Sequence, residues 1–252
     1  MELLLVRVAL APSLVLLASV VARRLGPRRG GQLLGAPTST GPFLALTWLG
    51  SGAAKTAAAA HGTVTGTLVV ACFCLAYARL APARRPAWTL VLTLAWAAVA
   101  GLVGASCGSV WLTAGLTVAV ISAGLLTWPA TGPSCPPPSR TRRWEIPVRM
   151  ALAGATVVTA LAAASALGSF VGGVLSALPV LLSVMGTSVH RTAGAPAAQE
   201  MMRGALTSAA GTLGFLLVLC FAPVSLGPLA AFLLALAALS ASDYLLRAVR
   251  HA

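Results

Sequence analysis

Residues 31–50 read GQLLGAPTSTGPFLALTWLG, and this stretch decides how the chain must fold. It is apolar and has about the 20 residues that a membrane-spanning helix needs. Its middle, PTSTGP, nevertheless holds two prolines, a glycine and three hydroxyl side chains. Proline interrupts a helix, and a break inside a membrane is tolerated only where protein or a wet cavity satisfies the freed backbone groups. The stretch therefore predicts a broken helix that faces the protein interior.

The composition around this stretch is typical of a helical membrane protein. Of 252 residues, 58% are hydrophobic and 8% are charged, whereas about a quarter are charged in soluble domains. The apolar runs are continuous and rich in alanine and leucine, which favours helices over a membrane β-barrel. We therefore predict an all-α, polytopic protein surrounded by membrane lipid.

The apolar runs predict about nine membrane-spanning helices. With the N-terminus outside, 15 of the 17 lysines and arginines fall in inside loops, and Arg7 and Lys55 remain outside. The positive-inside rule therefore predicts an outside N-terminus and a cytoplasmic C-terminus. The high content of alanine, glycine and arginine is typical of a GC-rich bacterial genome, which predicts the bacterial cytoplasmic (inner) membrane as the location. The predicted spans lie near 3–22, 31–50, 62–80, 87–105, 109–128, 148–167, 172–190, 204–222 and 227–246.

An internal repeat runs through the chain. VRVALA at 6–11 recurs as VRMALA at 148–153, and a Gly-Gly pair and a proline recur at the same offset of 142 residues. Between 6–37 and 148–179, 14 of 32 aligned positions are identical, against about four expected by chance from such a composition. Five predicted spans separate the two starts, an odd number, so the copies are expected to be inverted. Inverted repeats are a recurring architecture of secondary transporters, with the substrate site near the midplane.

This repeat divides the chain into three parts. We expect a first transmembrane repeat of four helices at 1–105 and a second at 148–252. Between them, 106–147 holds one linking helix and a cytoplasmic loop rich in proline and arginine. The linking helix is expected to reverse the orientation of the second copy in the membrane.

The break in the second predicted span recurs in the second copy, as GGVLSALPVLLSVMGTSVH from Gly172. Hydroxyl groups beside an opened helix suit a polar or anionic head group. The alternative is that these serines and threonines bond back to their own helices, because proline and glycine are common in membrane helices. The candidate substrate path comprises Gly35, Pro37, Thr38, Ser39, Thr40, Gly41, Pro42, Ser176, Pro179 and Ser183.

Ionisable residues are scarce and lie near span ends. His61, His190 and Arg203 form a possible polar gate, since a histidine near a membrane surface can relay protons. The alternative is that they are interfacial polar residues. Glutamate and aspartate occur only outside the middle of the spans, which disfavours proton or sodium coupling and suits a facilitator.

Other chemistry lacks a sequence signature. The chain has no paired-carboxylate site, phosphate loop or histidine cluster, and its cysteines have no zinc spacing, so we expect no catalytic site, no metal and no cofactor. The arginines follow span ends without basic–aromatic clusters, so no nucleic-acid partner is expected. The chain is therefore predicted not to be an enzyme.

The second copy, 148–246, resembles the small four-span inner-membrane proteins of the GlpM type. The resemblance rests on the glycine-rich entry, on the proline in ALPVLLSVMGTSVH and on the small-residue span that begins RGALTSAAGTLGF. That family carries an aromatic run around the proline, whereas Leu178 and Val180 flank Pro179 here. The resemblance implies a fused, inverted pair of such units, and it bears on architecture more than on activity.

Together these observations predict a transporter or translocator of a small polar or lipid-linked substrate, working by alternating access between inverted repeats. The alternative is a non-transporting subunit or accessory protein of a larger membrane complex, with a membrane-protein partner or a second copy of the chain. The short loops and scarce buried charge of this chain fit that alternative equally well.

Overall fold

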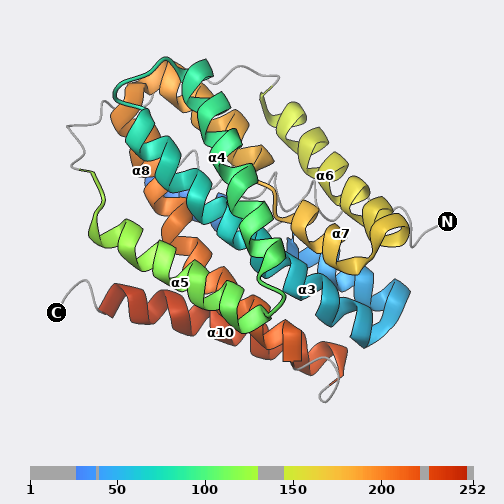
Figure 1. Cartoon of the computed structure of the whole chain (residues 1–252). Helices are drawn as coiled ribbons and strands as arrows, with labels where there is room; N and C mark the ends of the chain where they lie inside the picture. Colours follow the sequence, from blue (N-terminus) through green and yellow to red (C-terminus); the bar gives the residue numbers. More distant parts are fainter. Residues whose placement is uncertain (1–26, 38–39, 130–144, 222–226, 249–252) are drawn as a thin grey trace.

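The computed structural model describes residues 27–37, 40–129, 145–221 and 227–248 (Figure 1). These residues form helices and short connections and contain no strand, which confirms the predicted all-α class for this part of the chain. The eight helices of the described residues are α2 Pro27–Gly35, α3 Thr40–Leu80, α4 Pro86–Ser106, α5 Val110–Leu126, α6 Glu145–Leu167, α7 Ser169–Ser176, α8 Val180–Phe221 and α10 Pro228–Ala248.

Among the described residues, three stretches are long and apolar enough to cross a membrane, namely Arg28–Leu80, Pro86–Ser106 and Ser169–Phe221. They make the chain compatible with a membrane location. The predicted count of about nine spans is not supported by the described residues. Predicted spans 31–50 and 172–190 begin in α2 and α7, and their later parts join spans 62–80 and 204–222 within α3 and α8. The first predicted span, 3–22, lies outside the described residues.

Both longest stretches fold back on themselves at a glycine. Within them α3 has 41 residues and α8 has 42, and as straight helices these would extend about 62 Å across a hydrocarbon layer of about 30 Å. Gly52 has φ 81° and ψ 179°, and Gly194 has φ 84° and ψ 174°. Residues with a side chain rarely adopt such a positive φ, so glycine permits both turns. We call 40–51 and 53–80 the first and second arms of α3, and 180–193 and 195–221 those of α8.

The two turns lie at opposite ends of the bundle (Figure 1). The α8 turn contacts the C-terminal end of α3, where the Gln199 side chain donates a 2.8 Å hydrogen bond to the carbonyl of Ala78. The α3 turn lies beside the α6–α7 junction, where Ser51 and Ser169 line one hollow. The second arm of α3 separates the two turns, and a helix of its length extends about 42 Å.

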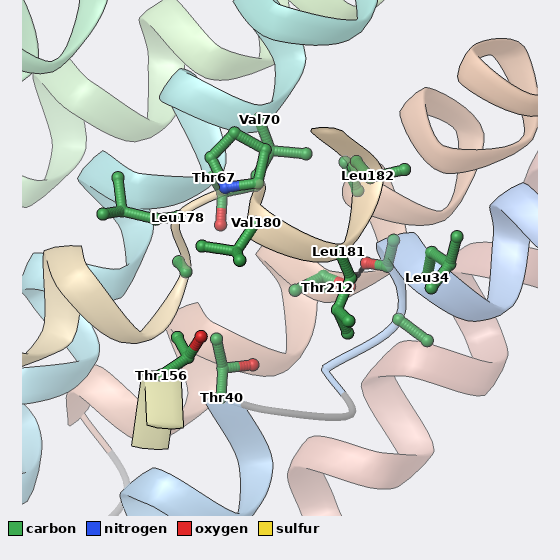
Figure 2. A pocket seen from close by; sticks show the side chains of 15 residues that line it. Leu34, Thr40, Thr67, Val70, Thr156, Leu178, Val180, Leu181, Leu182 and Thr212 are labelled. Carbon is green, nitrogen blue, oxygen red and sulfur yellow. Dashed lines mark hydrogen bonds between the residues drawn. The ribbon is translucent and has the colours of Figure 1, made fainter. Parts of the chain in front are cut away.

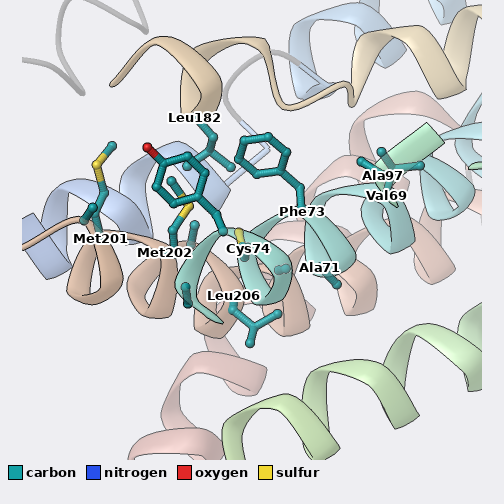
Figure 3. Close-up of a cluster of buried hydrophobic side chains, with 14 of the residues drawn as sticks. Val69, Ala71, Phe73, Cys74, Ala97, Leu182, Met201, Met202 and Leu206 are labelled. Carbon is teal, nitrogen blue, oxygen red and sulfur yellow. The ribbon is translucent and has the colours of Figure 1, made fainter. Parts of the chain in front are cut away.

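The core lies between α3 and α8. Side chains of α3, including Phe73 and Cys74, pack against Leu182, Met202 and Leu206 of α8 (Figure 3). Small residues elsewhere on these helices bring backbones into contact. In a bilayer the lipid is as apolar as leucine, so such close packing, rather than removal from water, holds helices together.

The outer helices present large apolar side chains to their surroundings. On α4, Trp88 is 62% exposed and Leu102 is 73% exposed, and on α5 Leu126 is 87% exposed. On α10, Leu229 is 74% exposed. A soluble monomer rarely exposes such continuous apolar surface, so these faces suit contact with lipid.

Candidate functional site

Two short helices, α2 and α7, each lie in close backbone contact with a long helix, and a glycine permits each contact. A Cβ atom on Gly31 of α2 would overlap the carbonyl oxygen of Met201 in the second arm of α8. A Cβ atom on Gly173 of α7 would overlap the carbonyl oxygen of Ala59 in the second arm of α3. Residues 31 and 173, and 59 and 201, are each 142 apart, the offset of the sequence repeat.

Two glycines on the long helices α3 and α8 make the corresponding contacts with the short helices. A Cβ atom on Gly62 would overlap the carbonyl oxygen of Phe170, and one on Gly204 would overlap the carbonyl oxygen of Arg28. Both pairs again differ by 142 residues. The short helix α2 therefore packs against the second arm of α8, and the short helix α7 packs against the second arm of α3. The atoms in contact are at equivalent positions of the repeat.

A cavity opens where both helix breaks meet. Its volume is about 50 Å³, against about 10–15 Å³ for one water on this measure, so it has room for a few waters or one small molecule. Its lining consists of residues at the two breaks, of the second arms of α3 and α8, and of one residue of α6. They are Leu34, Gly35, Ala36, Thr40, Thr67, Val70, Thr156, Ala177, Leu178, Pro179, Val180, Leu181, Leu182, Ala209 and Thr212.

The lining follows the repeat. Ten of these residues form five pairs at an offset of 142, so that the two halves surround the cavity with equivalent positions. The pairs are Gly35 with Ala177, Ala36 with Leu178, Thr40 with Leu182, Thr67 with Ala209 and Val70 with Thr212. Equivalent positions carry different side chains, so the cavity is symmetric in backbone position and asymmetric in chemistry.

Three of the four lining threonines have hydrogen-bond partners in helices. Thr67 and Thr156 donate to the carbonyls of their own helices, to Thr63 at 2.9 Å and to Leu152 at 2.8 Å. Thr212 instead donates across the halves, to the carbonyl of Gly35 at 2.9 Å, and so satisfies the C-terminal end of α2 (Figure 2).

Thr40 differs from the other three. It is only 5% exposed, and its hydroxyl has no hydrogen-bond partner within the part of the chain that the structure describes. The side chain stands beside Thr156 at one end of the cavity, with its hydroxyl directed into it (Figure 2). A buried hydroxyl without a partner costs about 1–3 kcal/mol, and a bound ligand would recover part of that cost.

The backbone of the second break is described in full. Ala177 and Leu178 donate their amides to the carbonyls of Val174 and Leu175, which closes the end of α7. Pro179 precedes the first residue of α8, and its carbonyl accepts the amide of Ser183 at 2.8 Å. The break thus ends one helix and begins the next within three residues, at the wall of the cavity.

The predicted substrate path falls partly on this cavity. Gly35, Thr40 and Pro179 line it. Thr38 and Ser39 lie outside the described residues, and Pro37, Gly41, Pro42, Ser176 and Ser183 are described but do not line the cavity. The hydroxyls of Ser176 and Ser183 donate to the carbonyls of Gly173 and Pro179, as the back-bonding alternative anticipates.

Sequence reasoning missed Thr67, Thr156 and Thr212. They lie on α3, α6 and α8, far from the breaks along the chain. The repeat offset alone could have related Thr212 to Val70. No local sequence pattern indicated that Thr67, Thr156 or Thr212 lies near the breaks.

The three predicted gate residues lie elsewhere. His61 packs edge-on against Phe170, with ring centroids 5.2 Å apart. The buried His190 has its Nδ1 atom 3.3 Å from the hydroxyl oxygen of Tyr77, at the α8 turn. Arg203 pairs with Glu200 at 3.9 Å. None of the three lines the central cavity, and the structure does not bring them together as one gate.

A second, wider cavity lies at the α3 turn. Its volume is about 390 Å³, and its lining includes Thr47, Ser51 and Lys55 of α3 together with Ser165 of α6 and Ser169 of α7. Thr40 and Thr47 are seven residues apart on the first arm of α3, about two helical turns, so they share one face of that arm. Thr156 and Ser165 likewise lie on one helix, α6. The first arm of α3 and α6 therefore contribute residues to both cavities.

Within the described residues no group of three or more histidine, cysteine, aspartate or glutamate side chains could hold a metal ion. Comparisons with known proteins identify no relative: no protein-family model, curated protein or solved structure matches this chain. The resemblance to GlpM-type proteins therefore stays a prediction.

Proposed function

We propose that this chain is a membrane transporter that carries a small polar solute by alternating access, with residues 1–105 and 148–252 as inverted repeats. The observation that carries the proposal is the central cavity, at which both helix breaks meet. A helix break inside a membrane is stable only where it lines protein or a wet cavity. Two breaks that share one cavity, lined by equivalent positions of both halves, match the substrate sites of inverted-repeat transporters.

The arrangement of the turns supports the inverted orientation. Because the α3 and α8 turns lie at opposite ends of the bundle, equivalent parts of the two halves would face opposite sides of a membrane that the bundle crosses from end to end. Under the charge-based topology, Ser51 at the first turn faces outside and Thr192 at the second turn faces the cytoplasm. Exchanging the conformations of the two halves would then open the cavity to the other side at similar free energy.

The size of the cavity favours a small solute over a lipid-linked one. A volume of about 50 Å³ admits a few heavy atoms, whereas drug-sized ligands occupy pockets of about 300–1,000 Å³. No acidic side chain lines the cavity among the described residues, which supports movement down a gradient rather than proton or sodium coupling.

The test is accessibility of the cavity from both sides. The native cysteines are first replaced, and Thr156→Cys then places a single thiol at the wall of the cavity. Membrane vesicles of both orientations are treated with a membrane-impermeant thiol reagent. Alternating access predicts labelling of Thr156→Cys from either side. Ala60→Cys is the matched control, since Ala60 is fully buried away from the cavity and should label from neither.

Labelling from one side alone, or from neither, would reject alternating access and favour the non-transporting subunit. In that case co-purification with a second membrane protein becomes the informative measurement. A stable, monodisperse chain expressed alone would argue against an obligate subunit.

A further inference from the structure

We propose that the solute is a small monovalent anion, bound in the central cavity by main-chain amides at the start of α8 and by the hydroxyl of Thr40. The inference rests on the proposed function, because it names the substrate class of the same cavity. It follows from hydrogen-bond donors at the cavity that have no partner within the described residues.

Several acceptors at the helix ends already have hydrogen-bond partners. At the end of α2, the carbonyl of Gln32 accepts the amide of Ala36 at 3.0 Å, and that of Gly35 accepts the hydroxyl of Thr212. At the end of α7, the carbonyls of Val174 and Leu175 accept amides at 3.2 and 3.3 Å. A bound cation would have to share these carbonyls with the hydrogen bonds that they already accept.

Two of the donors at the start of α8 have no partner among the described residues, whereas the amide of Val180 donates to the carbonyl of Leu178 at 2.8 Å. The first amides of an α-helix have no partner within it and depend on a cap. The preceding residue, Pro179, has no side-chain oxygen to act as that cap. The amides of Leu181 and Leu182 form no hydrogen bond within the described part of the chain, and both residues line the cavity. The helix dipole adds about half a positive charge at this end.

Thr40 provides independent support for a ligand. Its hydroxyl is buried, has no partner in the described chain and is directed into the same cavity (Figure 2). It stands at the first residue of α3, at a position equivalent to Leu182 of α8. An acceptor in the cavity would therefore meet a hydroxyl from one half and amides from the other.

The lining also limits the charge of the ligand. It contains no ionisable side chain among the described residues, so nothing compensates a second negative charge, and a buried uncompensated charge is costly. Dipoles and hydroxyls suffice for one delocalised or single charge, as at other helix N-termini. With room for a few heavy atoms, chloride, nitrate and formate are the fitting probes.

The wider cavity at the α3 turn fits the same ligand. Its lining includes the exposed Lys55 and the hydroxyls of Ser51 and Ser165. A lysine at the rim of a hollow raises the local concentration of anions. This cavity and the central cavity share the first arm of α3 and α6 as walls, so it is a suitable entrance on the predicted outer side.

The experiment measures binding and flux separately. In detergent, the unfolding temperature of the full chain is followed while sodium chloride, nitrate or formate is titrated at constant ionic strength against gluconate, with sulfate as the divalent comparison. We expect saturable stabilisation by a monovalent anion and none by sulfate. Thr40→Val should weaken that anion about tenfold or more, because a hydrogen bond to a charged group is lost. Thr40→Ser should retain it.

Thr117→Val is the matched control, because Thr117 is buried on α5 and bonds to its own helix. In proteoliposomes, flux of the binding anion is driven by a potassium gradient with valinomycin, and urea and glycerol are tested as neutral solutes. Anion binding that Thr40→Val weakens, together with anion flux, supports both proposals.

The remaining outcomes separate the two. Saturable anion binding without flux of any solute would overturn the proposed transport and leave the anion site. Flux of urea or glycerol, without anion binding, would overturn the anion assignment and leave the transporter. Equal weakening by Thr40→Val and Thr117→Val would show that the hydroxyl of Thr40 does not contact the anion, and would overturn its role.

Discussion

Replacing one glycine in each half by alanine tests the reciprocal packing of the short helices. Gly62 lies against the backbone of α7, and Gly204 lies against the backbone of α2. In both cases an added Cβ would come closer to a carbonyl oxygen than the 3.0 Å that real Cβ atoms respect. Because the obstacle is backbone rather than a flexible side chain, a whole helix must move to relieve the overlap.

The magnitude follows from two opposing terms. Overpacking of this kind costs about 3 kcal/mol, the upper end of the usual range, since no side chain can rotate away. Alanine is favoured over glycine within a helix by about 1 kcal/mol. The net loss is therefore about 2 kcal/mol for each variant, and for a chain of this size it lowers the unfolding temperature by about 4–8 °C.

The assay is thermal unfolding of the purified protein in detergent, followed by tryptophan fluorescence. Gly115→Ala on α5 is the control, because nothing lies within 4 Å of a Cβ at that position, and it should be neutral or slightly stabilising. The reasoning requires similar losses at both test positions. A neutral Gly62→Ala or Gly204→Ala, or a loss no larger than that of Gly115→Ala, would refute the close reciprocal contacts.

Three further changes test the site and the topology. Thr212→Val removes the bond to the carbonyl of Gly35 and should lower stability by about 1 kcal/mol, or about 2–4 °C in the unfolding temperature; the exposed Thr192→Val should change it little. Pro179→Ala supplies an amide that allows α7 and α8 to join into one helix. Solute flux in proteoliposomes should then fall about tenfold or more, while the unfolding temperature stays unchanged. Unchanged flux would mean that transport does not need the break. In intact cells, an impermeant thiol reagent should label Ser51→Cys and not Thr192→Cys, and labelling of both would contradict the inverted orientation.

Several features of the fold are determined by local sequence. Long alanine- and leucine-rich runs specify helices wherever they occur, and Pro37 and Pro179 interrupt helices because they lack an amide. The offset of 142 residues, visible in the sequence, is also the offset of the glycine contacts and of five pairs in the cavity lining. Helix formation and the proline breaks depend on each residue and its chain neighbours, and the repeat offset is found by comparing the sequence with itself, so one sequence suffices to infer them.

The number of separate helices was harder to infer. The later part of predicted span 31–50, from Thr40, is joined to span 62–80 through the Gly52 turn into one helical run, α3. A turn at a single glycine leaves no polar loop, and the surrounding residues stay helical on both sides. Hydropathy therefore marks the crossing segments without marking where one helix ends.

Tertiary structure alone decided the composition of the cavity. Thr67, Thr156 and Thr212 meet there from three helices, although no local pattern relates them to the breaks. In the sequence, a threonine that bonds to its own helix, such as Thr67, looks the same as Thr212, which bonds across the halves, or Thr40, which has no described partner. The difference depends on which backbone lies within about 3 Å of the hydroxyl. That distance is set by helices packing through glycine, a long-range property that no single stretch of sequence contains.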